Sequence, residues 1–140
     1  MNTRWMTTLG VLSAFSILAG PAQSADATKP VNCIPLSRIE STQAIDDQTI
    51  LFYMRGGDIY VNQLSNRAFG LARNRPFMYK SSTGQLCNHD IITVLEPLGF
   101  GYMQGAWAGL GKFVPTDEAR ADALKGGQPV EDVFEPLPAE

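Results

Sequence analysis

The sequence predicts a mainly β protein: a small antiparallel β-barrel or sandwich of five to six strands, with one short C-terminal helix. Short runs rich in β-branched and aromatic residues recur through residues 33–115, and clusters of Gly, Asp and Ser separate them. A capped helical pattern begins only after these runs, at Thr116. An oligonucleotide-binding-like or similar barrel is the shape that fits these signals.

The first residues predict export. A short positive region, Met1 to Arg4, precedes an apolar run from Met6 to Leu18, and small residues follow at Ala22-Gln23-Ser24. We therefore expect a signal peptide over residues 1–24, because its apolar core is too short to span a bilayer as a helix. Cleavage is expected after Ser24, with Ala27 as the alternative. The protein would then be periplasmic or secreted, with no stable membrane insertion.

Export decides how the two cysteines are interpreted. Cys33 and Cys87 are the only ones in the chain, and an even count in an oxidising compartment predicts one disulfide. The bond would close a loop of about fifty residues, for which the chain-entropy model gives roughly 4 kcal/mol. The chain has a single His and no Cys-x-x-Cys motif, so we expect neither a metal site nor a cofactor.

Charge is unevenly distributed along the chain, whose net charge is −3. Residues 33–114 carry seven basic and six acidic side chains, whereas residues 115–140 carry two basic and seven acidic ones. A nucleic-acid partner needs a basic face, so this distribution argues against one. We expect residues 127–140 to form a disordered acidic tail and residues 25–32 a flexible lead-in.

The first strands are predicted around a hairpin. Arg38 to Ile45 predicts a strand, the Asp46-Asp47-Gln48 sequence a turn, and Thr49 to Leu64 a hairpin about Gly56-Gly57. With a two-residue turn, the pairing would place Arg55 opposite Asp58 and Tyr53 opposite Tyr60.

This register assigns the two faces of the hairpin. The face expected in the core carries apolar residues: Ile50, Phe52, Met54, Ile59 and Val61. The other face carries Tyr53 and Tyr60, which we interpret as a possible ligand face. The alternative is that these two tyrosines only shield the outer side of the sheet.

The later elements follow from shorter signals. Phe77 to Lys80 predicts a short strand, and Ile91 to Leu95 a well-buried one. The glycine-rich segment 97–113 predicts a loop that leads into a last strand, about Ala106 to Val114. Thr116 is the expected N-cap of a helix from Asp117 to about Leu124, within a helical region 116–126 that completes the domain of residues 33–115.

The order of these signals resembles that of a known family. The motifs that carry the likeness are Ile45-Asp46-Asp47-Gln48-Thr49-Ile50, Gly70-Leu71, Gly84-Gln85-Leu86-Cys87 and Gly111-Lys112-Phe113-Val114-Pro115. Over about residues 32–115 the chain is similar to a family of small exported bacterial proteins that is catalogued as a domain of unknown function.

The resemblance has structural implications but implies no activity. Members of that family often carry a second cysteine pair, where this chain has Ala68 and either Ala106 or Ala108. The joint loss of both partners supports a bond between Cys33 and Cys87. It also implies that the Ala68 region packs near Ala108.

Three functional hypotheses remain open, because no residue set commits the chain to a chemistry and we predict no catalytic residue. The first is a non-catalytic envelope module that binds a protein, a glycan or a small ligand through Tyr53 and Tyr60. The second is a hydrolase that uses carboxylates from a set of four turn residues: Asp46, Asp47, Asp90 and the neighbouring His89. The third is a membrane-associating or oligomerising protein that uses the segment 97–113.

Overall fold

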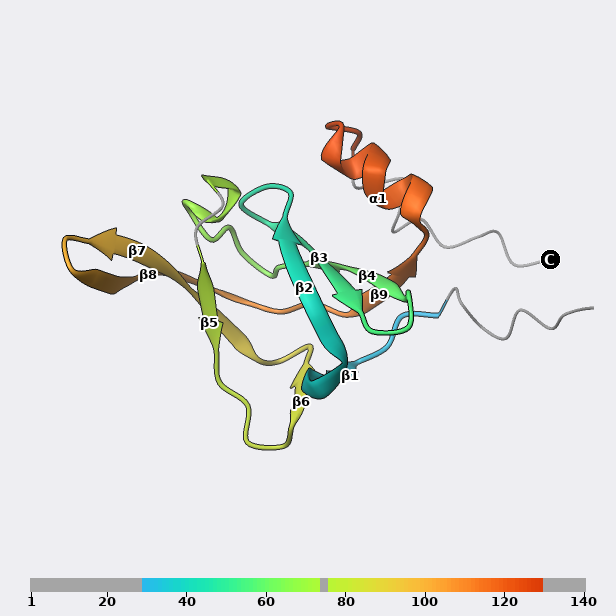
Figure 1. The fold of residues 1–140 in the computed structure, drawn as a ribbon, viewed down its shortest axis with the longest axis horizontal. Helices are drawn as coiled ribbons and strands as arrows, with labels where there is room; N and C mark the ends of the chain where they lie inside the picture. Colours follow the sequence, from blue (N-terminus) through green and yellow to red (C-terminus); the bar gives the residue numbers. More distant parts are fainter. Residues whose placement is uncertain (1–28, 74–75, 130–140) are drawn as a thin grey trace, which may run out of the picture.

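The computed structural model describes residues 29–73 and 76–129, and β-strands dominate it (Figure 1). The predicted signal peptide with both cleavage sites, and most of the predicted tail, lie outside the described residues. The strands are β1 (Cys33–Pro35), β2 (Ile39–Ala44), β3 (Thr49–Met54), β4 (Ile59–Gln63), β5 (Phe77–Tyr79), β6 (Gln85–Cys87), β7 (Ile91–Leu98), β8 (Gly101–Gly109) and β9 (Phe113–Thr116). The helices are the short 3-10 turns η1 (Leu36–Arg38) and η2 (Leu71–Arg73) and the α-helix α1 (Glu118–Lys125).

The strands form three antiparallel sheets, so the predicted mainly β class with one C-terminal helix is confirmed. The largest sheet has the order β2-β3-β4-β9, the second the order β5-β7-β8, and β1 pairs with β6. None of the described sheets closes on itself, so the arrangement is sandwich-like and not a barrel (Figure 1). In this arrangement β2 and β5 are both edge strands.

The main core fills the space between the sheets. Its buried members come from all three sheets and their connections: Ile34, Ile50, Phe52, Met54, Leu64, Ala68, Leu71, Leu86, Ile92, Val94, Ala108, Leu110 and Phe113. Phe52 meets Phe113 edge to face, with ring centroids 5.3 Å apart. The β3–β4 hairpin therefore supplies the centre of this core through its even-numbered residues.

A second, smaller core lies on the opposite face of the β3–β4 hairpin. There α1 packs Ala121 and Leu124 against Leu51, Val61 and Val114. Helix α1 begins after Asp117, whose carboxylate accepts a hydrogen bond from the Arg120 N–H (2.7 Å). The predicted helix is thus confirmed, but the predicted N-cap at Thr116 is wrong, because Thr116 is still the last residue of β9.

The predicted hairpin is confirmed, and its predicted register is wrong by one residue. The Met54 N–H donates to the Asp58 C=O (2.9 Å) and the Gly57 N–H to the Met54 C=O (3.1 Å), which closes a three-residue loop. Both glycines adopt positive φ angles, 106° and 94°. Arg55 belongs to the loop because its N–H donates to the Arg38 C=O (2.7 Å) and not across the hairpin.

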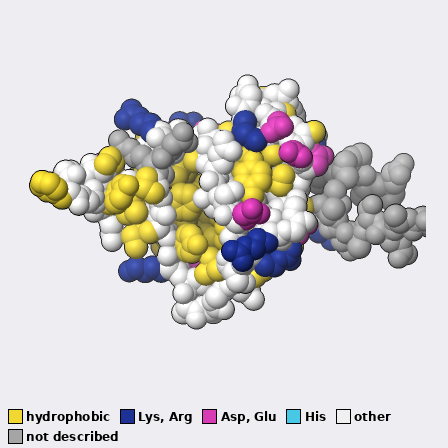
Figure 2. All heavy atoms as spheres, viewed as in Figure 1, with side chains coloured by type: hydrophobic (Ala, Val, Ile, Leu, Met, Phe, Trp, Pro, Cys, Tyr) yellow, Lys and Arg dark blue, Asp and Glu magenta, His cyan; other side chains and the backbone are white. Residues whose placement is uncertain are grey.

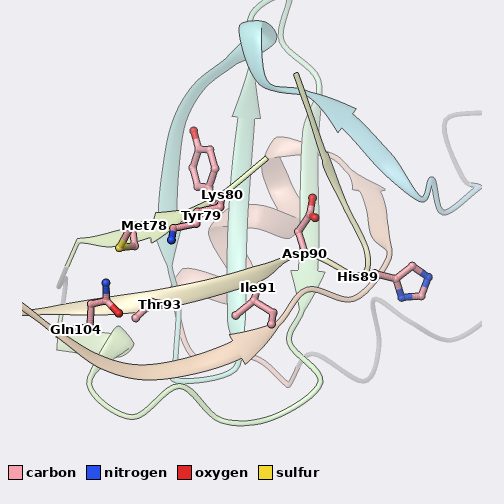
Figure 3. Close-up of a pocket in the computed structure, with 8 residues that line it drawn as sticks. All are labelled: Met78, Tyr79, Lys80, His89, Asp90, Ile91, Thr93 and Gln104. Carbon is pink, nitrogen blue, oxygen red and sulfur yellow. The ribbon is translucent and has the colours of Figure 1, made fainter. Parts of the chain in front are cut away.

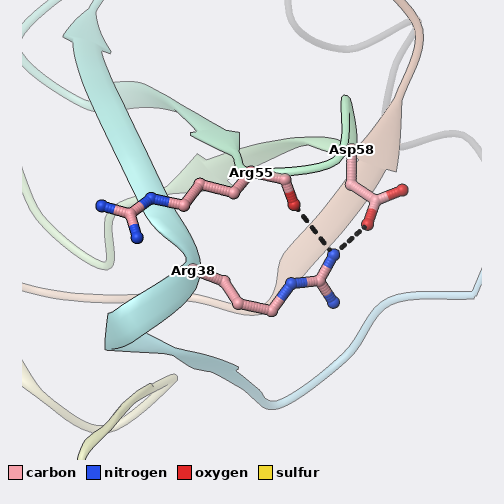
Figure 4. A network of polar contacts seen from close by, with 3 residues as sticks. All are labelled: Arg38, Arg55 and Asp58. Carbon is pink, nitrogen blue, oxygen red and sulfur yellow. Dashed lines mark hydrogen bonds and ion pairs between the residues drawn. The ribbon is translucent and has the colours of Figure 1, made fainter.

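The charge pair beside this turn also differs from the prediction. Arg38 Nη2 lies 3.1 Å from Asp58 Oδ2 and donates to the Arg55 carbonyl at the same distance. Figure 4 shows that the Arg55 side chain points away from Asp58. The predicted Arg55–Asp58 pair is therefore wrong, and Arg38 takes the place of Arg55.

The glycine-rich segment forms two strands, β8 and β9, where a loop and a single last strand were predicted. Gly111 lies in the short link between them, where an added Cβ would clash with the Gln63 carbonyl oxygen. Buried Asn62 holds this link: its Nδ2 donates to the Gly111 C=O (2.8 Å), and its Oδ1 accepts from the Gly111 N–H (3.0 Å). Pairing with β7 along its whole length outweighs the low strand propensity of glycine in β8.

The predicted disulfide is confirmed. Cys33 and Cys87 face each other in the β1–β6 ladder, with their Cα atoms 4.0 Å apart. The implied contact between the Ala68 region and Ala108 is also confirmed, since both side chains are fully buried in the main core. Hydrogen bonds fix this contact: the Ser65 N–H donates to the Gly109 C=O (2.9 Å) and Asn66 Nδ2 to the Trp107 C=O (2.9 Å).

Candidate functional site

The two tyrosines of the predicted ligand face lie on opposite faces of the hairpin. In the observed register Tyr53 pairs with Ile59, and Tyr60 pairs with Phe52. Tyr53 packs against the smaller core under α1, where the Lys125 ammonium lies 5.7 Å from its ring centroid, whereas Tyr60 packs against the main core. The predicted Tyr53–Tyr60 pair is wrong, because a slip of one residue moves every side chain of one strand to the other face.

His89 and Asp90 lie in the turn between β6 and β7, and Asp90 has a structural role there. Its carboxylate accepts a hydrogen bond from the Cys87 N–H (2.7 Å), and its own N–H donates to the Cys87 C=O (2.9 Å). Figure 3 shows that the exposed His89 ring points away from this carboxylate. Both residues border a cavity of about 420 Å³ that also includes Lys80, Thr93 and Gln104.

Asp46 and Asp47 hold turns at a different place in the fold. Asp46 Oδ1 accepts from the Gln48 N–H (2.6 Å), and Asp47 Oδ1 accepts from the N–H groups of Gly70 (3.1 Å) and Ala72 (3.0 Å). They border their own cavity, which shares no lining residue with the cavity at His89. The four residues of the hydrolase hypothesis are therefore divided between two cavities.

Among the described residues there is no group of three or more His, Cys, Asp or Glu side chains that could hold a metal ion. No helix in residues 29–73 or 76–129 is long and apolar enough to cross a membrane.

Exposed hydrophobic side chains concentrate on one element, the β7–β8 hairpin. Of the eight large hydrophobic side chains that the described part of the chain exposes, six belong to this hairpin: Ile91, Leu98, Phe100, Tyr102, Met103 and Trp107. Figure 1 shows that the hairpin projects from the body, and Figure 2 shows hydrophobic side chains gathered at that end of the molecule. Such a concentration on one projecting element is typical of a docking surface.

The end of this hairpin is apolar on both of its faces. Leu98 pairs with Gly101 and Glu96 with Met103 on one face, while Pro97 pairs with Tyr102 on the other. Phe100 stands in the turn and is fully exposed, and Leu98 and Tyr102 are 61% and 64% exposed. We call residues 97–104 the hairpin tip; it contains no charged side chain.

The base of the hairpin is anchored in the main core and differs from the tip. Ile92, Val94 and Ala108 are fully buried there. A bulge separates base from tip, because two residues of β8, Gly105 and Ala106, lie opposite Val94 alone. Gly105 fits beneath Glu96, whose Cγ would lie only 2.8 Å from an added Cβ. The tip is thus held out by a base that packs one face into the main core.

The sequence pattern indicated this segment only as an alternative to the tyrosine face. Its signal was the absence of charge from Pro97 to Gly111, combined with Phe100, Tyr102, Met103 and Trp107. The pattern did not indicate that these side chains are exposed, because the same composition also suits a buried strand. No protein-family model, curated protein or solved structure matches the chain, so the site is interpreted from its geometry alone.

Proposed function

We propose that this protein is an exported, non-catalytic binding module that associates reversibly with lipid surfaces through its hairpin tip. The observation that carries the proposal is that the tip is uncharged and exposes apolar side chains on both faces and at its end. A flat protein interface would cover one face of a hairpin only. A lipid interface surrounds both, and Tyr and Phe side chains are well suited to it.

The backbone hydrogen-bonding groups of the tip limit how deeply it can enter a lipid bilayer. Among the described residues β7 and β8 pair only with each other at the tip, so their outer edges present N–H and C=O groups that pair with no described strand. Such groups are too costly in hydrocarbon, where no water can bond them. The strands therefore lie among the lipid headgroups, and only the turn at Phe100 reaches further. Burying a side chain such as Leu98 or Phe100 gives roughly 1.5–3 kcal/mol, which suits weak, reversible association.

Vesicle flotation tests this proposal. We expect the exported chain to float with phosphatidylcholine vesicles, and a variant with Leu98→Ser, Phe100→Ser and Met103→Ser to remain unbound. Added salt or anionic lipid should change little, because the tip has no cationic side chain. Phe69→Ser is the matched control, since Phe69 is 67% exposed but lies outside the hairpin.

Three results contradict the proposal. The first is an exported chain that does not float, and the second is an equal loss of flotation in the Phe69→Ser variant. The third comes from sedimentation without vesicles: a concentration-dependent dimer that the triple variant abolishes would mean that the tip docks on a second copy of the chain.

A further inference from the structure

A groove separates two sheet edges that pair with no further strand among residues 29–73 and 76–129. It lies between β2, the edge of the four-stranded sheet, and β5, the edge of the three-stranded sheet. Its volume is about 500 Å³, within the range of ligand-binding clefts. In Figure 2 hydrophobic side chains are visible in the gap that Figure 1 shows between these two strands.

The pairing of β2 with β3 determines which backbone groups of β2 face the groove. The Ile45 N–H donates to the Thr49 C=O (2.9 Å), which makes Ile45 and Thr49 a hydrogen-bonded pair. In the same register Gln43 lies opposite Leu51 and Ser41 opposite Tyr53. Because hydrogen-bonded and non-bonded pairs alternate in antiparallel sheets, the N–H and C=O groups of the residues between them, Thr42 and Ala44, point into the groove.

The pairing of β5 with β7 likewise determines which backbone groups of β5 face the groove. The Leu95 N–H donates to the Pro76 C=O (2.8 Å), so the next hydrogen-bonded pair in this register is Met78 with Thr93. The backbone groups of Phe77 and Tyr79 therefore point away from β7, into the groove. Each wall offers two N–H and two C=O groups at a spacing of two residues, which is the spacing that an extended polypeptide matches.

The remaining walls of the groove specify the side chains of its occupant. On the core side the groove is lined by apolar groups, Leu36, Ile39 and Phe77. The only charged residue among its described lining residues is Glu40, which is exposed. An extended segment with alternate apolar residues and one basic side chain complements both features.

We propose that this groove accepts an extended polypeptide segment of a partner protein as an added strand between β2 and β5, with a basic side chain opposite Glu40. The segment hydrogen-bonds to Thr42 and Ala44 on one side and to Phe77 and Tyr79 on the other, and so joins the two open sheets. Unpaired edges are otherwise a liability that folded proteins cover or blunt. This site is separate from the hairpin tip and does not depend on the lipid proposal.

Hydrogen exchange on the exported chain, without vesicles, tests the groove. The probe is the hexapeptide acetyl-Lys-Val-Thr-Val-Thr-Val-amide. We expect the amides of Thr42, Ala44, Phe77 and Tyr79 to exchange at least about tenfold more slowly when the peptide is bound. No change at these amides with millimolar peptide overturns the proposal. Slow exchange at all four before any peptide is added also overturns it, because the chain itself would then fill the groove.

A pair of substitutions tests the alternation along β2. Thr42→Pro removes an N–H that faces the groove, so we expect it to weaken binding of the hexapeptide at least about tenfold and to leave the melting temperature nearly unchanged. Gln43→Pro removes an N–H that pairs with β3 and should lower the melting temperature markedly. If Thr42→Pro also unfolds the chain, a second experiment uses the unchanged chain and a hexapeptide that is methylated at alternate backbone nitrogens. The methylated hexapeptide can pair with one edge only, so an affinity equal to that of the unmethylated hexapeptide contradicts the proposal.

Discussion

The β3–β4 and β7–β8 hairpins are alike in composition and opposite in surroundings. Both join aliphatic and aromatic strands through a turn that contains glycine. In β3 the residues Thr49, Ile50, Leu51 and Phe52 are all buried, because the main core covers one face and α1 covers the other. In the β7–β8 hairpin only one face of the base is covered, and residues 97–104 are exposed on both faces.

The difference shows that burial, and not composition, separates a structural hairpin from a docking one. Helix α1 is what turns the outer face of β3–β4 into a second core, and no described element does the same for the hairpin tip. Apolar side chains that the fold leaves uncovered in one place require an explanation outside folding. Substitutions at individual residues of the two hairpins and of α1 test this difference.

The largest effect is expected from a matched pair of phenylalanines. Phe52→Ala should lower the free energy of unfolding by roughly 5 kcal/mol, at the upper end for this change, because the ring is fully buried against Phe113. Phe100→Ala should change it by less than about 0.5 kcal/mol, because the ring is fully exposed. Urea denaturation measures both. Similar losses in the two variants would show that the tip is part of the folded core.

A smaller loss of stability is expected when the packing of α1 over the β3–β4 hairpin is reduced. Leu124→Ala removes a buried side chain that packs over the outer face of β3–β4, and we expect a loss of about 3 kcal/mol in the free energy of unfolding. Exposed Tyr102 of the other hairpin is the control, and Tyr102→Ala should cost less than about 0.5 kcal/mol. A negligible effect of Leu124→Ala would mean that α1 does not stabilise this face.

A smaller effect is expected at the start of α1. Asp117→Ala removes the N-cap, whose carboxylate accepts a hydrogen bond from the Arg120 N–H, and should cost about 1 kcal/mol. Thr116→Ala is the comparison, because that residue was expected to be the cap from sequence. A larger fall in melting temperature for Thr116→Ala than for Asp117→Ala would contradict the assignment of Asp117 as the N-cap.

The smallest effect concerns Lys125, at the other end of α1. A hydrogen bond to Asp122 (2.6 Å), and then contact with Tyr53, raises the pKa of Lys125 above its ordinary value of 10.5. A raised pKa in the folded state stabilises the fold below the ordinary pKa, and the benefit is lost as pH rises through the folded value. Lys125→Met should therefore lower the melting temperature slightly near neutral pH. At a pH well above 10.5 the difference should vanish, and a constant difference would contradict the assignment.

Signals that depend on local sequence or on the cysteine count predicted the structure well. The Gly56-Gly57 pair correctly predicted a hairpin, and the run from Ile91 to Leu95 correctly predicted a strand. The presence of two cysteines in a chain expected to be exported correctly predicted a disulfide. The register of the hairpin could not be predicted in this way. It depends on Arg38, which lies seventeen positions before Arg55 and holds it in the turn.

The same limit applies to the candidate site. One residue of register divided Tyr53 and Tyr60 between two faces, so the predicted ligand face could not be found from local pairing. The first half of strand β8, before Ala106, was missed because its glycines oppose strand formation locally, and only its pairing with β7 outweighs them. The groove depends on β2 and β5, which are far apart in sequence and lie on facing edges only in the folded chain.

A tryptophan placed in the turn of the β7–β8 hairpin reports whether the tip enters a lipid surface. Trp5 belongs to the predicted signal peptide, so the double variant Trp107→Phe, Phe100→Trp, produced without residues 1–24, has one tryptophan, in the turn. With phosphatidylcholine vesicles we expect its emission to shift to shorter wavelength, and lipids brominated on their acyl chains should quench it. The matched reporter Trp107→Phe, Phe69→Trp should show neither effect. An unchanged emission at position 100, or equal changes at both positions, would contradict the assignment of the hairpin tip as the docking element.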